Sequence, residues 1–482
     1  MVFSDLFFLF AFIPAFALCY IIASLIDKRR QSVATTSKCL MRNITTVAFS
    51  LIFYGWGEPI YVFLMIVCVL LNYLSGLGID RYEGKKRKQA LVIGLILNIT
   101  ILSIFKYAGL IASTLNSIGI PVHIPTIALP IGISFYTFQS ISYLVDVYRK
   151  EAPVQRKFGG LLLYISMFPQ LVAGPIVRYD SIAREINDRS TNAQDIADGV
   201  FRFMIGLAKK VILANQLGEI ADQFLLNGLN NLSTAGAWIG AIAYGFQIYF
   251  DFSGYSDMAI GMGRCMGFHF NENFNHPFCA TSISDFWRRW HISLGSFFRD
   301  YVYIPLGGNR SHQIRNIIIV WALTGLWHGA SWTFMLWGLY FGLVLVLEKY
   351  TLMRFIERVP RVVLHTYSFL MITFSWGIFY FDTIDAMGTF FKSFFGCGTI
   401  SSDIAEQSAI WGNFWLWAAA IIFSMPVRKF VADKSAYLLR NNPTTLSYVE
   451  LTSRIVVSLL IIITSVALLV GATNNAFIYT RF

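Results

Sequence analysis

Repeated apolar runs of about twenty residues dominate this sequence, and each is long enough to cross a hydrocarbon core of about 30 Å. Only 13% of the residues are charged and 56% are hydrophobic, whereas about a quarter of the residues in soluble domains are charged. We therefore predict an all-α polytopic membrane protein, with about 11–12 transmembrane helices plus re-entrant or interfacial helices around a central cavity. The predicted crossings are residues 6–26, 43–56, 59–77, 90–111, 129–147, 198–226, 235–262, 314–329, 332–348, 362–381, 410–427 and 454–473.

Basic residues lie in the loops between the apolar runs and account for the net charge of +11. No soluble basic module is long enough to fold alone, which argues against a nucleic-acid-binding protein. Basic loops alternate with loops nearly free of Lys and Arg, so the positive-inside rule places both termini outside the cytoplasm. We expect a single membrane-embedded domain over residues 1–482, with its first apolar run retained as a helix because no basic leader precedes it. The six cysteines are scattered without the spacing of a disulfide framework.

Two segments fit this scheme of crossings badly. Residues 158–178 are apolar but interrupted by proline and glycine, and residues 281–298 are too rich in Arg and Trp to face lipid. Broken backbone at membrane depth persists only where protein or a water-filled cavity satisfies it. We predict that both segments are re-entrant or interfacial elements on the cytoplasmic side, walling a cavity that leads toward His328.

His328 lies near the end of an apolar helix, within the sequence LTGLWHGA. An imidazole at this depth is energetically costly unless it is paired or faces a cavity, so it is a candidate catalytic residue. The alternative is a helix-end histidine bonded to a backbone carbonyl.

His291 lies between a tryptophan and an apolar residue in the polar segment upstream. Residue chemistry alone favours an interfacial anchor over a catalytic role. Three arginines and two tryptophans surround it as a candidate donor-binding cluster: Trp287, Arg288, Arg289, Trp290 and Arg299. The arginines are either ordinary positive-inside charges or ligands for the phosphates of a cytosolic donor.

Other polar residues point to structural roles. Asp251 and Asp257 lie near the inner end of an apolar helix, and we expect them to pair with arginines of the following segment. His269 and His276 flank a polar loop whose spacing matches no standard metal site, so we predict no metal centre.

The segments SISDFWRRWHISLGSFFRDYVYIPLGGNR (282–310) and LTGLWHGASWTFMLWG (323–338) resemble the signature of the membrane-bound O-acyltransferase family. Within the family they resemble the bacterial branch that contains the membrane subunit of alginate O-acetylation. The resemblance extends over residues 53–65, 129–149, 168–179 and 249–263, with a signature core of about 129–348, and weakens after residue 349.

The resemblance implies acyl transfer at the bacterial inner membrane, with His328 as the family's hallmark histidine and His291 as its second. It implies an acetyl group taken from a cytosolic thioester, acetyl-CoA, without a bound cofactor. The acceptor would be an extracytoplasmic polysaccharide such as alginate, reached through an SGNH/GDSL-like acetyltransferase partner. Imidazole acts in such a reaction as a general base or as a transient acyl carrier, and the sequence leaves both open. Candidate oxyanion donors are the indoles of Trp327 and Trp332, or a backbone amide.

Alternative functions within the class are O-acetylation of peptidoglycan or cellulose and D-alanyl transfer to teichoic acid. A secondary transporter is the alternative from another class, but we find neither the internal repeat nor the midplane ionisable pairs typical of transporters.

The final residues, NNAFIYTRF (474–482), follow the last predicted crossing on the outer side. Aromatic anchors with one arginine are typical of protein interfaces, so we predict that this tail docks the partner. The alternative is that the aromatic residues lie in the interfacial belt of the membrane.

Overall fold

The computed structural model describes residues 2–31, 38–125, 127–352, 355–398, 404–438, 442–471 and 477. Regular structure in these residues is helical, which confirms the predicted fold class. The chain divides into two compact units that are each discontinuous in sequence. Unit 1 combines Met1–Phe203 with Tyr255–Glu272, and unit 2 combines Met204–Gly254 with Asn273–Ile478. That residues 1–482 form one domain stays a prediction.

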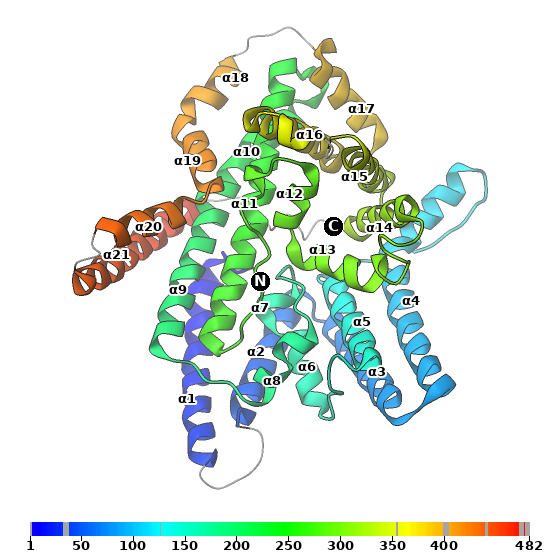
Figure 1. Cartoon of the computed structure of the whole chain (residues 1–482), viewed down its shortest axis with the longest axis vertical. Helices are drawn as coiled ribbons and strands as arrows, with labels where there is room; N and C mark the ends of the chain where they lie inside the picture. Colours follow the sequence, from blue (N-terminus) through cyan, green and yellow to red (C-terminus); the bar gives the residue numbers. More distant parts are fainter. Residues whose placement is uncertain are drawn as a thin grey trace. The chain divides into compact units, whose positions relative to one another are not determined.

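Unit 1 carries most of the N-terminal helices, and α3, α4 and α5 pack against one another within it (Figure 1). Its helices are α1 (Ile13–Gln31), α2 (Leu40–Gly57), α3 (Tyr61–Arg81), α4 (Gly84–Ser117), α5 (Ile133–Arg149), α6 (Phe158–Ser166), α7 (Phe168–Leu171) and α8 (Tyr179–Asn187). The predicted break in residues 158–178 is present, because α6 and α7 are short and separated at Met167.

Two helices contribute residues to both units: α9 (Ala193–Ala208) and α11 (Thr234–Met266). The remaining helices of unit 2 are α10 (Asn215–Asp222), α12 (Ile283–Arg289), α13 (Ile292–Phe298), α14 (Gln313–His328), α15 (Trp332–Tyr350), α16 (Arg361–Tyr380), α17 (Ile384–Lys392), α18 (Ile404–Gln407), α19 (Phe414–Ser424), α20 (Val427–Leu438) and α21 (Pro443–Val470).

By length and hydropathy, six helices in the described ranges are suited to cross a membrane, or up to seven if a bent pair of helices counts as one span. They are Phe8–Arg30, Tyr61–Arg81, Gly84–Ser117, Trp332–Tyr350, Arg361–Tyr380 and Thr445–Val470, with Phe414–Ser424 and Lys429–Leu438 as the bent pair. The other predicted crossings fall on α2, α5, α9 with α10, α11 and α14, which are too short or too polar to pass this criterion.

Asp251 and Asp257 both form ion pairs, but with other partners than the predicted arginines of the following segment. Asp251 pairs with Lys210 at 2.6 Å, and Asp257 pairs with Arg202 at 2.8 Å. Both partners precede the aspartates instead of following them. Lys210 belongs to η2 (Lys209–Ala214), a π-helical segment between α9 and α10. The structural role that we expected for both carboxylates agrees with this pairing, because a buried charge requires an opposite one.

The helix that ends at His328, α14, and the following helix, α15, approach each other closely. A Cβ atom added at Gly325 would collide with the backbone carbonyl of Phe334, and one added at Gly338 would collide with that of Trp321. Small residues permit this approach of two helix backbones. The resulting helix pair fixes the position of His328 at the end of α14.

Candidate functional site

The short helix α12 is anchored at its N-terminus by a buried carboxylate of α15. Glu348, which is 1% exposed, accepts hydrogen bonds from the backbone amides of Ile283 (2.6 Å) and Ser284 (2.7 Å). The hydroxyl of Ser282 accepts a third from the amide of Asp285 at 3.0 Å. Because the first amides of a helix lack intrahelical partners, and because a negative charge complements the helix dipole, these bonds stabilise α12 in this position.

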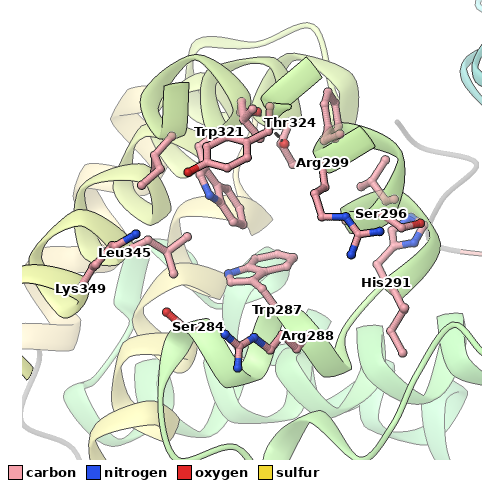
Figure 2. Close-up of a pocket in the computed structure, with 17 residues that line it drawn as sticks. Ser284, Trp287, Arg288, His291, Ser296, Arg299, Trp321, Thr324, Leu345 and Lys349 are labelled. Atoms are coloured by element: carbon pink, nitrogen blue, oxygen red, sulfur yellow. Dashed lines mark hydrogen bonds between the residues drawn. The ribbon is translucent and has the colours of Figure 1, made fainter. Parts of the chain in front are cut away.

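A pocket of about 590 Å³ opens beside α12, and its volume lies in the range of small-molecule sites. Figure 2 shows Trp287, Arg288, Arg299 and Lys349 around it. The lining residues all belong to unit 2: Ser284, Trp287, Arg288, His291, Ile292, Leu294, Gly295, Ser296, Phe298, Arg299, Tyr303, Ile317, Val320, Trp321, Thr324, Leu345 and Lys349. Residues 158–178 are not among them, and a role for that segment in walling a cavity that leads toward His328 stays a prediction.

The predicted donor-binding cluster separates into residues that line the pocket and residues that do not. Trp287, Arg288 and Arg299 line it. Arg289 instead bonds Asp285 of its own helix at 2.9 Å. Trp290, which is 2% exposed, packs within the aromatic core, for example against Phe286. Arg289 and Trp290 therefore do not line this pocket, and a part for them in donor binding stays a prediction.

The cations of the pocket differ in whether the protein already neutralises them. Arg299 bonds Asp300 at 2.7 Å, and this hydrogen bond raises the pKa of its guanidinium. Neither Arg288 nor Lys349 forms an ion pair with any residue in the described ranges. The indole Nε1 of Trp287 is likewise buried without a hydrogen-bond partner there. These three groups are available to an anionic, hydrogen-bonding ligand.

His291 is buried, not interfacial, so the anchoring role that residue chemistry favoured is wrong. Its side chain is 1% exposed, and its backbone adopts the left-handed conformation (φ 44°) between α12 and α13. Nδ1 lies 3.2 Å from Oδ1 of Asn273, whereas Nε2 has no hydrogen-bond partner among the described residues. Burial lowers the pKa of the imidazole from 6.5 to about 3, so the ring is neutral at neutral pH.

His328 is the last residue of α14 and lies in an aromatic enclosure. It is 3% exposed, and its ring lies 4.8 Å from Trp327, 4.9 Å from Trp337 and 5.3 Å from Phe379, measured between ring centroids. His328 does not itself line the 590 Å³ pocket, although Trp321 and Thr324 of the same helix do. Trp327 also contacts His291, with its ring 5.7 Å away, and therefore joins the two histidines.

The candidate oxyanion donors differ in how exposed they are. Trp332 is 50% exposed, which excludes it from a buried site. Trp327 is 4% exposed and contacts both histidines. Sequence reasoning missed Trp337, which is 1% exposed and whose Nε1 has no hydrogen-bond partner in the part of the chain that the structure describes.

Sequence reasoning missed two further residues of the site. Lys349 follows the apolar run of α15, and a cation at this place is typical of an ordinary helix end. Asn273 lies in a polar loop that gave no metal or catalytic pattern. A basic residue directly after a predicted crossing was the only available signal for Lys349, and none pointed to Asn273.

The predicted role of the C-terminal tail is wrong at the one residue of it that the structure describes. Phe477 is 1% exposed, and its ring lies 6.4 Å from the ring of Phe252 and 5.9 Å from Nζ of Lys210. It is part of the core of unit 2 and is not free to dock a partner. Residues 474–476 and 478–482 lie outside the described residues.

The long apolar helices define an integral membrane protein, and two buried histidines joined by one indole lie at or near a basic pocket in it. The chain belongs to the MBOAT, or membrane-bound O-acyltransferase, family, whose sequence model matches residues 49–388. It is therefore a multi-pass membrane O-acyltransferase.

Curated relatives match over most of the chain. A protein of Azotobacter vinelandii named "Probable alginate O-acetylase AlgI" is 37% identical over 90% of this chain and 86% of its own length. A protein of the same name from Pseudomonas aeruginosa is 39% identical over 83% of this chain and 76% of its own length. The "Peptidoglycan O-acetyltransferase" of Helicobacter pylori is 34% identical over 83% of this chain and 81% of its own length.

Proposed function

We propose that this protein moves an acetyl group from cytosolic acetyl-CoA across the bacterial inner membrane for O-acetylation of an extracytoplasmic polysaccharide such as alginate. An SGNH/GDSL-like acetyltransferase outside the membrane receives the group and places it on the polymer. The names of the two relatives of highest identity reported above support alginate over other acceptors.

One observation carries the proposal: two histidines contact the same indole, and one of them lines a basic pocket. Trp327 contacts His291 and His328, and His291 also lines the pocket that contains Arg288 and Lys349. A thioester of a phosphorylated carrier matches these features, because unpaired cations bind its phosphates while the reactive carbonyl lies beside His291, which Trp327 joins to His328. The aromatic surroundings exclude water, which would otherwise hydrolyse the thioester.

In the proposed reaction, an imidazole removes the proton from the hydroxyl of the acetyl acceptor. The oxygen of that hydroxyl adds to the thioester carbonyl at the same time. The C–S bond then breaks, the oxygen ester forms, and the proton returns to the departing thiolate as the free thiol of CoA. We assign this general-base role to His328, with His291 assisting. In the alternative, His328 itself accepts the acetyl group and CoA leaves before the hydroxyl attacks.

The test uses purified full-length protein in lipid nanodiscs with radiolabelled acetyl-CoA, its SGNH-like partner and polymannuronate. We expect His328→Ala to lose transfer to the polymer while remaining folded, and His123→Ala, at an exposed histidine, to retain it. Normal transfer by His328→Ala would overturn the catalytic assignment. Label that stays on the wild-type protein through an acid-labile bond when the acceptor is omitted would favour the covalent alternative.

Substrate identity is tested by exchanging the components. Transfer from an alanylated carrier protein, with no transfer from acetyl-CoA, would replace acetylation by D-alanylation. Transfer to peptidoglycan or cellulose, with none to polymannuronate, would keep the donor and change the acceptor.

A further inference from the structure

The side chain of Asn273 lies against the imidazole of His291, although the two residues are 18 positions apart. Asn273 is 0% exposed, and it precedes the loop that leads to α12. Its Oδ1 atom lies 3.2 Å from Nδ1 of His291, 3.1 Å from the amide nitrogen of Ser293 and 2.9 Å from Oγ of Ser293. Its backbone carbonyl also accepts a hydrogen bond from the amide of Ile292 at 3.0 Å.

These contacts determine which atoms carry protons. The backbone amide of Ser293 can only donate, so the carboxamide atom that it faces is the oxygen and not the nitrogen. The imidazole nitrogen that faces the same oxygen is therefore the protonated one, because two lone pairs would repel each other. His291 is consequently the Nδ1–H tautomer, and its Nε2 atom carries the lone pair.

The backbone of His291 gives the same carboxamide a second role. His291 adopts φ 44° and ψ 53°, a left-handed conformation that costs free energy in residues other than glycine. The amides of Ile292 and Ser293, directly after this residue, are both bonded to Asn273. Asn273 therefore holds the turn between α12 and α13 as well as the ring that this turn presents.

We infer that Asn273 is a positioning residue for acyl transfer, which sets the tautomer and orientation of His291 so that Nε2 is free to accept a proton during the reaction. The inference rests on the proposed function, in which His291 assists proton transfer. Asn273 acts only through His291 and is not a catalytic residue.

Among the described residues, no carboxylate bonds to His291, whose Nδ1 lies near Oδ1 of Asn273 and Oγ of Ser293. Phe252 of α11 and Trp327 of α14 pack on the ring, at 4.6 Å and 5.7 Å between centroids. The elements around the ring carry the pocket cations Arg288, Arg299 and Lys349 and the second histidine, His328. Apart from Glu348, which caps α12, the carboxylates on these elements pair with a cation: Asp251 with Lys210, Asp257 and Glu272 with Arg202, Asp285 with Arg289, and Asp300 with Arg299. A carboxylate introduced at position 273 would therefore be the dominant new charge acting on the ring.

Asn273→Asp separates positioning from bulk stability, because aspartate keeps an acceptor for Nδ1–H and adds a negative charge. The charge stabilises the imidazolium form, so the acidic limb of the kcat against pH profile should move toward higher pH, with activity retained above it. Asn273→Leu removes the acceptor, and we expect kcat to fall roughly 10²-fold with little change in the KM for acetyl-CoA.

Asn275→Asp is the matched control, because Asn275 lies two residues away with an exposed side chain. Its pH profile should equal that of the wild type. Identical pH profiles for Asn273→Asp and Asn275→Asp would overturn the inference.

Solid-state NMR of protein labelled at its seven histidines reads the tautomer without turnover. The resonances of His291 are assigned by their loss in His291→Gln. We expect the wild type and Asn273→Asp to show Nδ1–H, and Asn273→Leu to lose this preference; an Nε2–H tautomer in the wild type would refute the inference. If the tautomer depends on Asn273 but the wild type transfers no acetyl group, the proposed function fails while the assignment of the tautomer to Asn273 stands.

Discussion

His291 and His328 contact the same indole, that of Trp327, whose ring centroid lies 5.7 Å from the first imidazole and 4.8 Å from the second. The histidines come from different elements, a left-handed turn between short helices and the end of α14. Trp327 therefore couples the wall of the basic pocket to the enclosed imidazole of His328. The predictions below concern the groups that support this arrangement.

Arg288→Gln should raise the KM for acetyl-CoA about tenfold, which corresponds to the loss of one charge-assisted hydrogen bond of about 1.5 kcal/mol. Arg288 lines the pocket without an ion-pair partner in the described ranges, so its guanidinium is available to a phosphate. Arg289→Gln is the matched control, because Arg289 is adjacent in the same helix but bonded to Asp285. Steady-state kinetics at several acetyl-CoA concentrations measures both variants, and equal KM values would contradict the assignment.

Trp337→Phe should lower kcat roughly 10²- to 10³-fold, with a nearly unchanged KM for the donor. The substitution keeps a ring beside His328 but removes a buried N–H that has no partner in the described part of the chain. An unpaired donor near the reacting carbonyl is suited to stabilise a developing oxyanion. Trp376→Phe removes an equally buried N–H whose ring has no contact with His328 in the described contacts, and it should stay near wild-type kcat. Equal kcat values in the two variants would exclude the role of Trp337.

Glu348→Gln should decrease the free energy of unfolding by about 1–2 kcal/mol, because it removes the charge that caps α12. The variant should also raise the KM for acetyl-CoA, since α12 carries Trp287 and Arg288 into the pocket. Glu357→Gln, at an exposed glutamate, controls for the change in net charge. A thermal unfolding curve in detergent together with donor kinetics tests both effects; an unchanged Tm for Glu348→Gln would show that the cap contributes little.

The stability of the protein should fall as pH decreases from 6.5 toward about 3, and His291 should account for part of this loss. Burial lowers the pKa of His291 in the folded state, so between these values the unfolded chain binds a proton that the folded protein does not. The contribution is complete above the unfolded pKa and is lost as pH falls. His291→Gln should flatten this part of the Tm against pH curve. An unaltered slope in the variant would contradict the assignment.

Phe477→Ala should destabilise the protein by about 3 kcal/mol, because it leaves a cavity beside Phe252 and Lys210. Phe430→Ala removes a phenylalanine that is 67% exposed and should change Tm little. Co-purification of the SGNH-like partner is measured in parallel. Loss of the partner from Phe477→Ala without any change in Tm would restore the docking role that burial argues against.

Several features of the site are decided by local sequence. The apolar runs predicted the helical class, and each predicted crossing overlaps a helix of the structure. His328 was found because a single imidazole in an apolar helix stands out without knowledge of its neighbours. The prolines and glycines in 158–178 predicted the break between α6 and α7 for the same reason. Periodicity, hydropathy and backbone-breaking residues act over a few positions, so the sequence by itself determined these features.

Only the tertiary structure decided which polar residues meet. Successive helix residues point about 100° apart, so adjacent Arg288 and Arg289 face different surroundings, and only packing against α14 and α15 selects the one in the pocket. The same packing buries His291 and brings Asn273 to it across 18 positions, whereas composition alone favoured an interfacial anchor. Such contacts depend on how short helices turn and stack, and no local pattern encodes that geometry.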